Sequence, residues 1–227
     1  MNLPNLLASL SKDFIAVIDP TIPKEAYVSI DLSTTNQELD VTLFEQPDKH
    51  HQQIQTYLKA QNAQVAYGGY LEQRKLYDRS TYFEAVDNSL RRNIHLGLDL
   101  WCVAETAVVC PLDAKVHSYN NNTNFGDYGP TIILEHQLGK EVFYTLYGHL
   151  SVASIKDIKV GQKLLAGEVF ARLGSPAVNG EYAPHLHFQI IHDLQGMQGD
   201  YPGVASASQL EFYKNNCPDP NLLLKIY

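Results

Sequence analysis

Short runs of β-branched and aromatic residues recur at close spacing between residues 93 and 193, and they constrain the fold more than any other feature of the sequence. The runs are IHLGLDL, TAVVC, AKVHSY, TIILEH, VFYTLYGHL, KLLAGEVFARL and HLHFQII, with Gly, Pro and Asn between them. Closely spaced strands with turn signals and no long helical pattern are typical of antiparallel sheets. The region therefore predicts a mainly β fold whose core is an antiparallel β-sandwich or groove.

The segments on either side of this region have other patterns, so we expect three parts. Residues 1–91 predict an N-terminal α/β extension, residues 92–193 the β core, and residues 194–227 a C-terminal strap packed on the core. No stretch is rich enough in Gly or Ser to act as a flexible linker between freely moving domains.

The extension contains three segments whose structure can be predicted. DFIAVIDP (13–20) and YVSIDLS (27–33) are rich in β-branched residues and are followed by turn residues, so both predict strands. Between residues 47 and 64 an early Pro and an apolar stripe that includes Ile54 and Leu58 predict a helix.

The composition excludes two classes of partner. A formal net charge of −8 argues against nucleic acid, because phosphate binding favours a basic surface. No apolar run approaches the roughly 18 residues of a membrane-spanning helix, so no membrane partner is expected.

The N-terminal stretch and the cysteines bear on location. MNLPNLLASLSKDF has no basic region before its apolar residues, so no signal peptide is predicted, although a leader already removed would leave the same pattern. Cys102, Cys110 and Cys217 are odd in number and lack metal-type spacing, which argues against a disulfide framework. We therefore expect a cytoplasmic protein.

Residues 94–100, IHLGLDL, carry the first group of candidate functional residues. Aliphatic residues alternate with His95, Gly97 and Asp99, and this period of two predicts a strand with the imidazole and the carboxylate on one face. In a flat strand the Cα atoms of His95 and Asp99 would lie about 13 Å apart, which is long for two ligands of one ion. Glycine permits a bend, so we expect the strand to be kinked at or near Gly97.

Two further segments carry histidines. In PHLHF (184–188) an extended backbone directs His185 and His187 to the same face, about 6.6 Å apart. That spacing suits either two metal ligands or one ligand beside an acid/base group, and the spacing alone leaves both open. His149 follows a glycine at the end of the aromatic run VFYTLYGHL.

This set of residue types suits a zinc hydrolase. Catalytic zinc takes nitrogen and carboxylate ligands, usually three from the protein, and leaves a fourth position for water. The ion lowers the pKa of that water, and a histidine can accept or donate the proton that the reaction moves. Each histidine by itself is a weak signal; the order HxGxD, GHL and HLHF is what makes the combination specific.

The remaining histidines and the aromatic residues near the motifs are interpreted as structural. The histidines are His50, His51, His117, His136 and His192. Tyr119, Tyr128, Tyr144 and Tyr147 could line a substrate groove, but packing within the sheet is the favoured interpretation because tyrosine is common in half-buried strands.

RNIHLGLDLW, FYTLYGHLS, KVGQKLLAGEVFARLG and PHLHFQI together resemble the ordered motifs of the lysostaphin/LytM-type zinc metalloendopeptidases. The resemblance covers roughly residues 92–193 and implies a β groove of the duplicated hybrid motif type. It also implies bacterial peptidase activity on peptidoglycan, at glycyl or D-amino-acid bonds.

The resemblance assigns roles to individual residues. It implies one Zn²⁺ per chain, with His95, Asp99 and His187 as metal ligands. His149 and His185 become the non-ligand catalytic pair, without deciding which of them is the general base. The implied partner is a peptide or muropeptide-like substrate.

Two alternatives to a peptidase stay open at this stage. One is a non-catalytic zinc-binding or regulatory module of the same fold, and the other is a zinc hydrolase of a non-peptide amide or ester. YGGYLEQRKLY and FGDYGPTIILEH also look similar to such domains inside larger bacterial chains, beside kinase-like and aminotransferase-like domains. That second resemblance implies an intracellular task and an association with multidomain chains.

Overall fold

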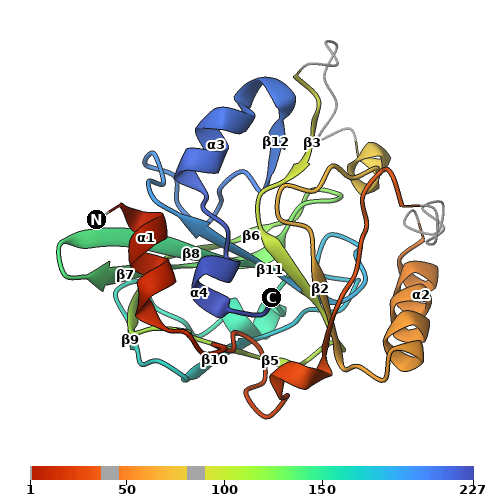
Figure 1. Cartoon of the computed structure of the whole chain (residues 1–227), viewed down its shortest axis with the longest axis horizontal. Coiled ribbons are helices and arrows are strands. Elements are labelled where there is room, and N and C mark those ends of the chain that lie inside the picture. The colour runs from red at the N-terminus through yellow and green to blue at the C-terminus, as the bar shows by residue number, and fades with distance from the viewer. Residues whose placement is uncertain (1, 37–45, 81–89) are drawn as a thin grey trace.

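The computed structural model describes residues 2–36, 46–80 and 90–227, and within them the protein is mainly β, as predicted (Figure 1). The strands are β1 (Tyr27–Ser29), β2 (Val65–Gly68), β3 (Arg92–His95), β4 (Leu98–Trp101), β5 (Ala107–Val109), β6 (Ala114–Asn122), β7 (Gly129–Leu138), β8 (Glu141–Gly148), β9 (Lys163–Leu164), β10 (Val169–Arg172), β11 (His185–Ile191) and β12 (Val204–Ser206). The helices are α1 (Leu3–Leu10), α2 (Pro47–Ala60), α3 (Leu210–Asn216) and α4 (Asn221–Leu224).

One eight-stranded sheet organises the molecule, in the order β1-β2-β4-β11-β8-β7-β6-β9. Only β1 and β2 pair in parallel; every other neighbouring pair in this sheet is antiparallel. β11 lies between β4 and β8, so His187 is opposite both Asp99 and Gly148. The sheet register thus brings the three histidine-containing motifs together, although up to about 90 residues separate them along the chain.

The two faces of β4 and β11 differ as the alternation predicts. Leu98 and Leu100 of β4 join Leu186 and Phe188 of β11 in the main apolar core. The residues between them point to the other face of the sheet, because successive side chains of a strand alternate. Strands β5 and β10 pair with each other outside the main sheet and contribute Val108 and other residues to the same core.

The three predictions for secondary structure in the N-terminal extension have different outcomes. The strand predicted at 27–33 is confirmed only over Tyr27–Ser29, which form β1, and the helix predicted at 47–64 is confirmed by α2, whose Ile54 and Leu58 are buried. The strand predicted at 13–20 is wrong: Ile18 forms one isolated bridge with Val108, and the chain then turns. The segment meets β5 at its middle residue, and β5 is only three residues long, so the pairing cannot extend further.

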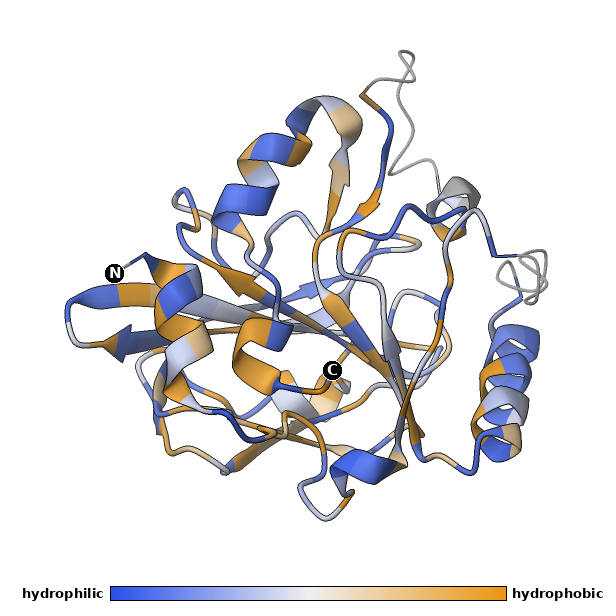
Figure 2. Ribbon diagram, viewed as in Figure 1, coloured by the Kyte–Doolittle hydropathy of each residue, from blue (hydrophilic) through white to orange (hydrophobic). Residues whose placement is uncertain are grey.

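The N-terminal segment contributes directly to the main sheet, because β2 pairs with β4 and β1 pairs with β2. Helix α2 stands apart from the sheet in Figure 1, and most of its ribbon has hydrophilic colours in Figure 2. The division at residues 91 and 193 stays a prediction.

The two ends of the chain meet on the sheet. α1 and α4 lie side by side in Figure 1, and the backbone N–H of Ile15 donates to the carbonyl of Leu224 at 2.9 Å. Leu7 and Leu224 are fully buried in the main core, where α4 presents an apolar surface (Figure 2). Among the described residues, no helix combines the length and the apolar character needed to span a bilayer.

Candidate metal centre and catalytic site

The predicted strand is interrupted at Gly97 and continues as a second strand, which confirms the predicted kink. β3 ends at His95 and pairs with β12, whereas β4 begins at Leu98 and belongs to the main sheet. A Cβ atom on Gly97 would lie 2.6 Å from Cε1 of His187 and 2.8 Å from the carbonyl oxygen of Phe188. Only glycine permits this approach, and the bend reduces the separation of His95 Nε2 and Asp99 Oδ1 to 3.2 Å.

Three predicted ligand atoms converge at this bend. His95 Nε2 and His187 Nδ1 are 2.8 Å apart, and each lies 3.2 Å from Asp99 Oδ1. Ligands of a tetrahedral zinc at about 2.0–2.1 Å lie about 3.3 Å from one another, so the triangle has the required size. All three side chains are buried.

Hydrogen bonds on the far side of each imidazole direct lone pairs toward this triangle. His95 Nδ1 lies 2.8 Å from the carbonyl oxygen of Gly69, and His187 Nε2 lies 3.0 Å from Oε1 of Gln189. Because these oxygens only accept, the protons of the neutral rings belong on the outer nitrogens. Asp99 Oδ1 finds no hydrogen-bond donor among the described residues. Three buried electron-pair donors without a shared proton fit a zinc ion.

Arg74 holds the other oxygen of the same carboxylate. Its Nη1 lies 2.5 Å from Asp99 Oδ2, its Nε lies 2.5 Å from Glu72 Oε2, and its side chain is 1% exposed. Burial alone would raise the pKa of Asp99, but the electrostatic effects of His95 and Arg74 outweigh burial and hold that pKa well below its ordinary value. Sequence reasoning missed Arg74, because YGGYLEQRKLY has no period that predicts its direction.

His149 and His185 lie beside the triangle, with ring centroids 4.2 Å apart. His185 Nε2 is 3.9 Å from Asp99 Oδ1. Nδ1 of His149 faces the carbonyl of Asn179 at 2.8 Å, and Nδ1 of His185 faces the carbonyl of Ala183 at 2.7 Å. These contacts place the ring protons on Nδ1 and leave both Nε2 atoms as acceptors.

The two rings are neutral at physiological pH. Burial lowers the pKa of His185 to about 4 and that of His149 well below its ordinary value. His149 also has a φ of 62°, a left-handed conformation that is uncommon outside glycine and that clusters at functional sites. The preceding Gly148 leaves room for Tyr128, because a Cβ there would lie 2.5 Å from the Tyr128 ring.

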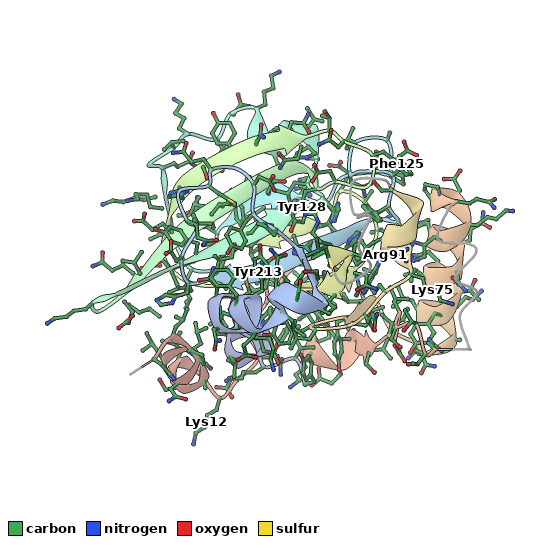
Figure 3. All side chains as sticks on the ribbon, turned by 90° about the horizontal axis from the view of Figure 1, so that it is seen from above. Lys12, Lys75, Arg91, Phe125, Tyr128 and Tyr213 are labelled. Carbon is green, nitrogen blue, oxygen red and sulfur yellow. The ribbon has the colours of Figure 1, made fainter. Side chains whose placement is uncertain are left out.

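A cavity of about 240 Å³ opens over the five predicted site residues. Tyr77, Tyr182 and Tyr201 line it together with Tyr128. The hydroxyl of Tyr128 is 3.4 Å from His187 Nε2, and Figure 3 shows this residue near the middle of the molecule, between the sheet and α3. Packing was the favoured interpretation of Tyr128, whereas the structure places it in the cavity wall.

The other candidates lie away from the cavity as the structure describes it. These are the histidines His50, His51, His117, His136 and His192 and the tyrosines Tyr119, Tyr144 and Tyr147. His136 is buried in the sheet, where Nε2 lies 2.7 Å from the hydroxyl of Thr145, so it is a satisfied core residue.

The sheet brings together a cluster of buried His and Asp side chains that could hold a metal ion. Residues 93–199 match the sequence model of Peptidase family M23. The match confirms the resemblance of this part of the chain to the lysostaphin/LytM-type zinc metallopeptidases.

The similarity to solved structures is weaker. The lysostaphin catalytic domain from Staphylococcus simulans is 27% identical, with 54% of this chain and 80% of that domain covered and a TM-score of 0.37. A putative peptidase M23 from Pseudomonas aeruginosa is 21% identical, with 59% of this chain and 44% of that one covered and a TM-score of 0.38. At these TM-scores the family assignment rests on the match of residues 93–199. No curated protein sequence matches the chain.

Proposed function

We propose that the protein is a zinc-dependent peptidase that cleaves glycyl or D-amino-acid bonds in cell-wall-derived peptides. One Zn²⁺ per chain is held by His95, Asp99 and His187. The observation that carries the proposal is the convergence of three buried lone-pair donors, one of them an Asp99 oxygen without a hydrogen-bond donor among the described residues. The family match supports the peptidase reaction.

The ion, when bound, lowers the pKa of a water molecule and polarises the scissile carbonyl. His149 and His185 each present an unprotonated Nε2, so one accepts the proton of the attacking water. The proton then passes to the leaving amine, while the oxygen of the water stays in the new carboxyl group. Burial keeps the pKa of Tyr128 well above its ordinary value, so its hydroxyl stays protonated and can donate to the developing oxyanion.

Two other functions remain as alternatives. A non-catalytic module of the same fold would bind zinc without turnover, and a hydrolase of a non-peptide amide or ester would use the same water. Two tautomer-fixed histidines beside the ligand triangle favour catalysis, because a binding module has no use for two buried proton acceptors.

Mass spectrometry of a peptide panel tests the proposal. Zinc-loaded protein is incubated with oligoglycines, muropeptides that contain D-amino acids, and ordinary L-peptides. We expect cleavage of a cell-wall-type peptide by the wild-type chain. We expect the His185→Ala variant to lose about 10²–10⁴-fold in rate while it still binds one zinc, because this histidine only moves protons.

His192→Ala is the matched control, since His192 is exposed and lies outside the cavity. Loss of zinc in His185→Ala would make that residue a ligand instead. A zinc-loaded wild-type chain that cleaves no panel member would overturn the peptidase and favour one of the two alternatives.

A further inference from the structure

A buried arginine from the N-terminal segment contacts the proposed metal site. Arg74 lies outside the M23 match of residues 93–199, yet its guanidinium donates to Asp99 Oδ2 inside the site. The carboxylate is therefore divided: Oδ2 faces the guanidinium, and Oδ1 faces the nitrogens of His95 and His187.

The guanidinium is held from several directions. Glu72 Oε2 accepts from Arg74 Nε, while Glu72 Oε1 accepts from the backbone N–H of Leu32 at 2.9 Å. The Arg74 guanidinium also lies over the Trp101 ring, 5.4 Å from its centroid. A Cβ on Gly69 would lie 1.8 Å from Arg74 Nη2, so glycine is required where the chain turns around the guanidinium.

The same turn also contacts the first histidine. The Gly69 carbonyl faces His95 Nδ1, and the backbone N–H of His95 donates to the carbonyl of Glu72 at 2.9 Å. The backbone N–H of Arg74 donates to the carbonyl of Asn93 at 2.9 Å. Residues 69–74 thus contact two of the three proposed ligands directly: His95 through the carbonyls of Gly69 and Glu72, and Asp99 through the Arg74 guanidinium.

We propose that Arg74, anchored by Glu72, is a positioning residue that makes Asp99 a one-oxygen ligand. The inference rests on the proposed function in one respect, namely that the site binds a metal ion. A carboxylate with two free oxygens can rotate and bind an ion through both. A guanidinium is a planar fork with fixed donor directions, so it holds Oδ2 in one orientation where an ammonium could not.

Charge and orientation act in opposite directions here, and the test must separate them. Removing Arg74 alone deletes a positive charge near a cation, which favours metal binding while the carboxylate loses its support. The double variant Glu72→Gln/Arg74→Met removes one negative and one positive charge. It therefore keeps the net charge of Glu72, Arg74 and Asp99 unchanged while it removes the guanidinium that holds Oδ2.

Zinc affinity and the visible spectrum of the cobalt-substituted protein are the readouts. We expect the double variant to lose roughly 10- to 100-fold in zinc affinity, as for other outer-sphere partners. We expect its cobalt bands to weaken, because binding through a second oxygen raises the coordination number. Arg74→Lys keeps the charge and most of the bulk, and it should show the same spectral change.

The control is Lys115→Met/Glu135→Gln, which removes a solvent-accessible ion pair of 2.7 Å between β6 and β7. If the double variant fails to fold, as judged by circular dichroism, Arg74→Lys decides. Unchanged affinity and an unchanged cobalt spectrum in the folded variants would overturn the inference. Neither readout uses a substrate, so a wild-type chain that binds zinc but cleaves nothing overturns the proposed function alone.

Discussion

At the scale of single residues, the outer hydrogen bonds of the four site histidines matter as much as the inner atoms. Each ring has one nitrogen against an oxygen acceptor, which is a backbone carbonyl for His95, His149 and His185 and a side-chain amide for His187. The acceptor fixes the tautomer before any ligand arrives. The sequence indicates which histidines belong to the site, but not the three backbone acceptors, because these come from segments outside the strands, without a regular pattern.

Removing the carboxylate of Asp99 tests the metal site most directly. We expect Asp99→Ala to lose bound zinc, since only two nitrogen ligands remain beside the positive charge of Arg74. Metal analysis of the dialysed protein measures this, with the exposed Asp157→Ala as control. Zinc retained at one per chain in Asp99→Ala would refute the assignment.

His136 gives a pH-dependent contribution to stability that is independent of the site. Burial lowers its pKa to about 4 from the ordinary histidine value of 6.5. Between these values the unfolded chain binds a proton that the folded chain does not, so stability falls as the pH decreases from 6.5 toward 4. The contribution lost is about 3 kcal/mol at most, at 1.36 kcal/mol per pKa unit.

Urea unfolding at several pH values checks this on metal-free protein. The lowered pKa values of His95, His149 and His185 act in the same direction, so the comparison is with His136→Gln, which cannot titrate. We expect a shallower decline of stability with decreasing pH in this variant. Parallel curves would show that His136 contributes nothing to the slope.

At the scale of secondary-structure elements, the break between β3 and β4 decides the geometry of the site. The two strands pair with different partners, β12 and β2, and Gly97 permits the change of direction. The alternation of residues 94–100 and the glycine predict both the shared face and the bend. The partners are not predictable, because they depend on contacts with residues far away in the sequence.

A methyl group at the break tests its role. We expect Gly97→Ala to destabilise the fold by about 1–3 kcal/mol and to weaken zinc binding, because the added carbon overlaps the His187 ring. Gly139→Ala is the control: it lies in the β7–β8 turn with φ 62° and open space around it. It should lose stability through backbone strain alone, and equal loss of zinc in both variants would contradict the prediction.

At the scale of the whole molecule, the N-terminal segment, the M23 segment and the C-terminal segment share one apolar core. Leu7 of α1, Leu186 of β11 and Leu224 of α4 belong to the same cluster. The sequence predicts the mainly β class and the positions of most strands along the chain, because each strand is visible as a short run of β-type residues. It does not predict that β1 and β2 extend the sheet beside β4 or that Arg74 enters the site, because local patterns carry no information on long-range pairing.

A truncation in the core tests the contribution of the N-terminus. We expect Leu7→Ala to lower the free energy of unfolding by about 2–5 kcal/mol, since Leu7 is fully buried. Leu165→Ala, at a position that is 67% exposed, should change it by less than about 0.5 kcal/mol. An effect of Leu7→Ala as small as that of the control would mean that α1 is dispensable for stability.

The register of β11 against β4 has a practical consequence. Slipping this pair by one residue would turn Leu186 and Phe188 into the polar cavity and bury His185 and His187 among aliphatic side chains. A misaligned chain therefore cannot assemble the triangle of ligand atoms. In any purified preparation, the ratio of tightly held metal to polypeptide becomes a direct count of the molecules whose central strands are correctly aligned.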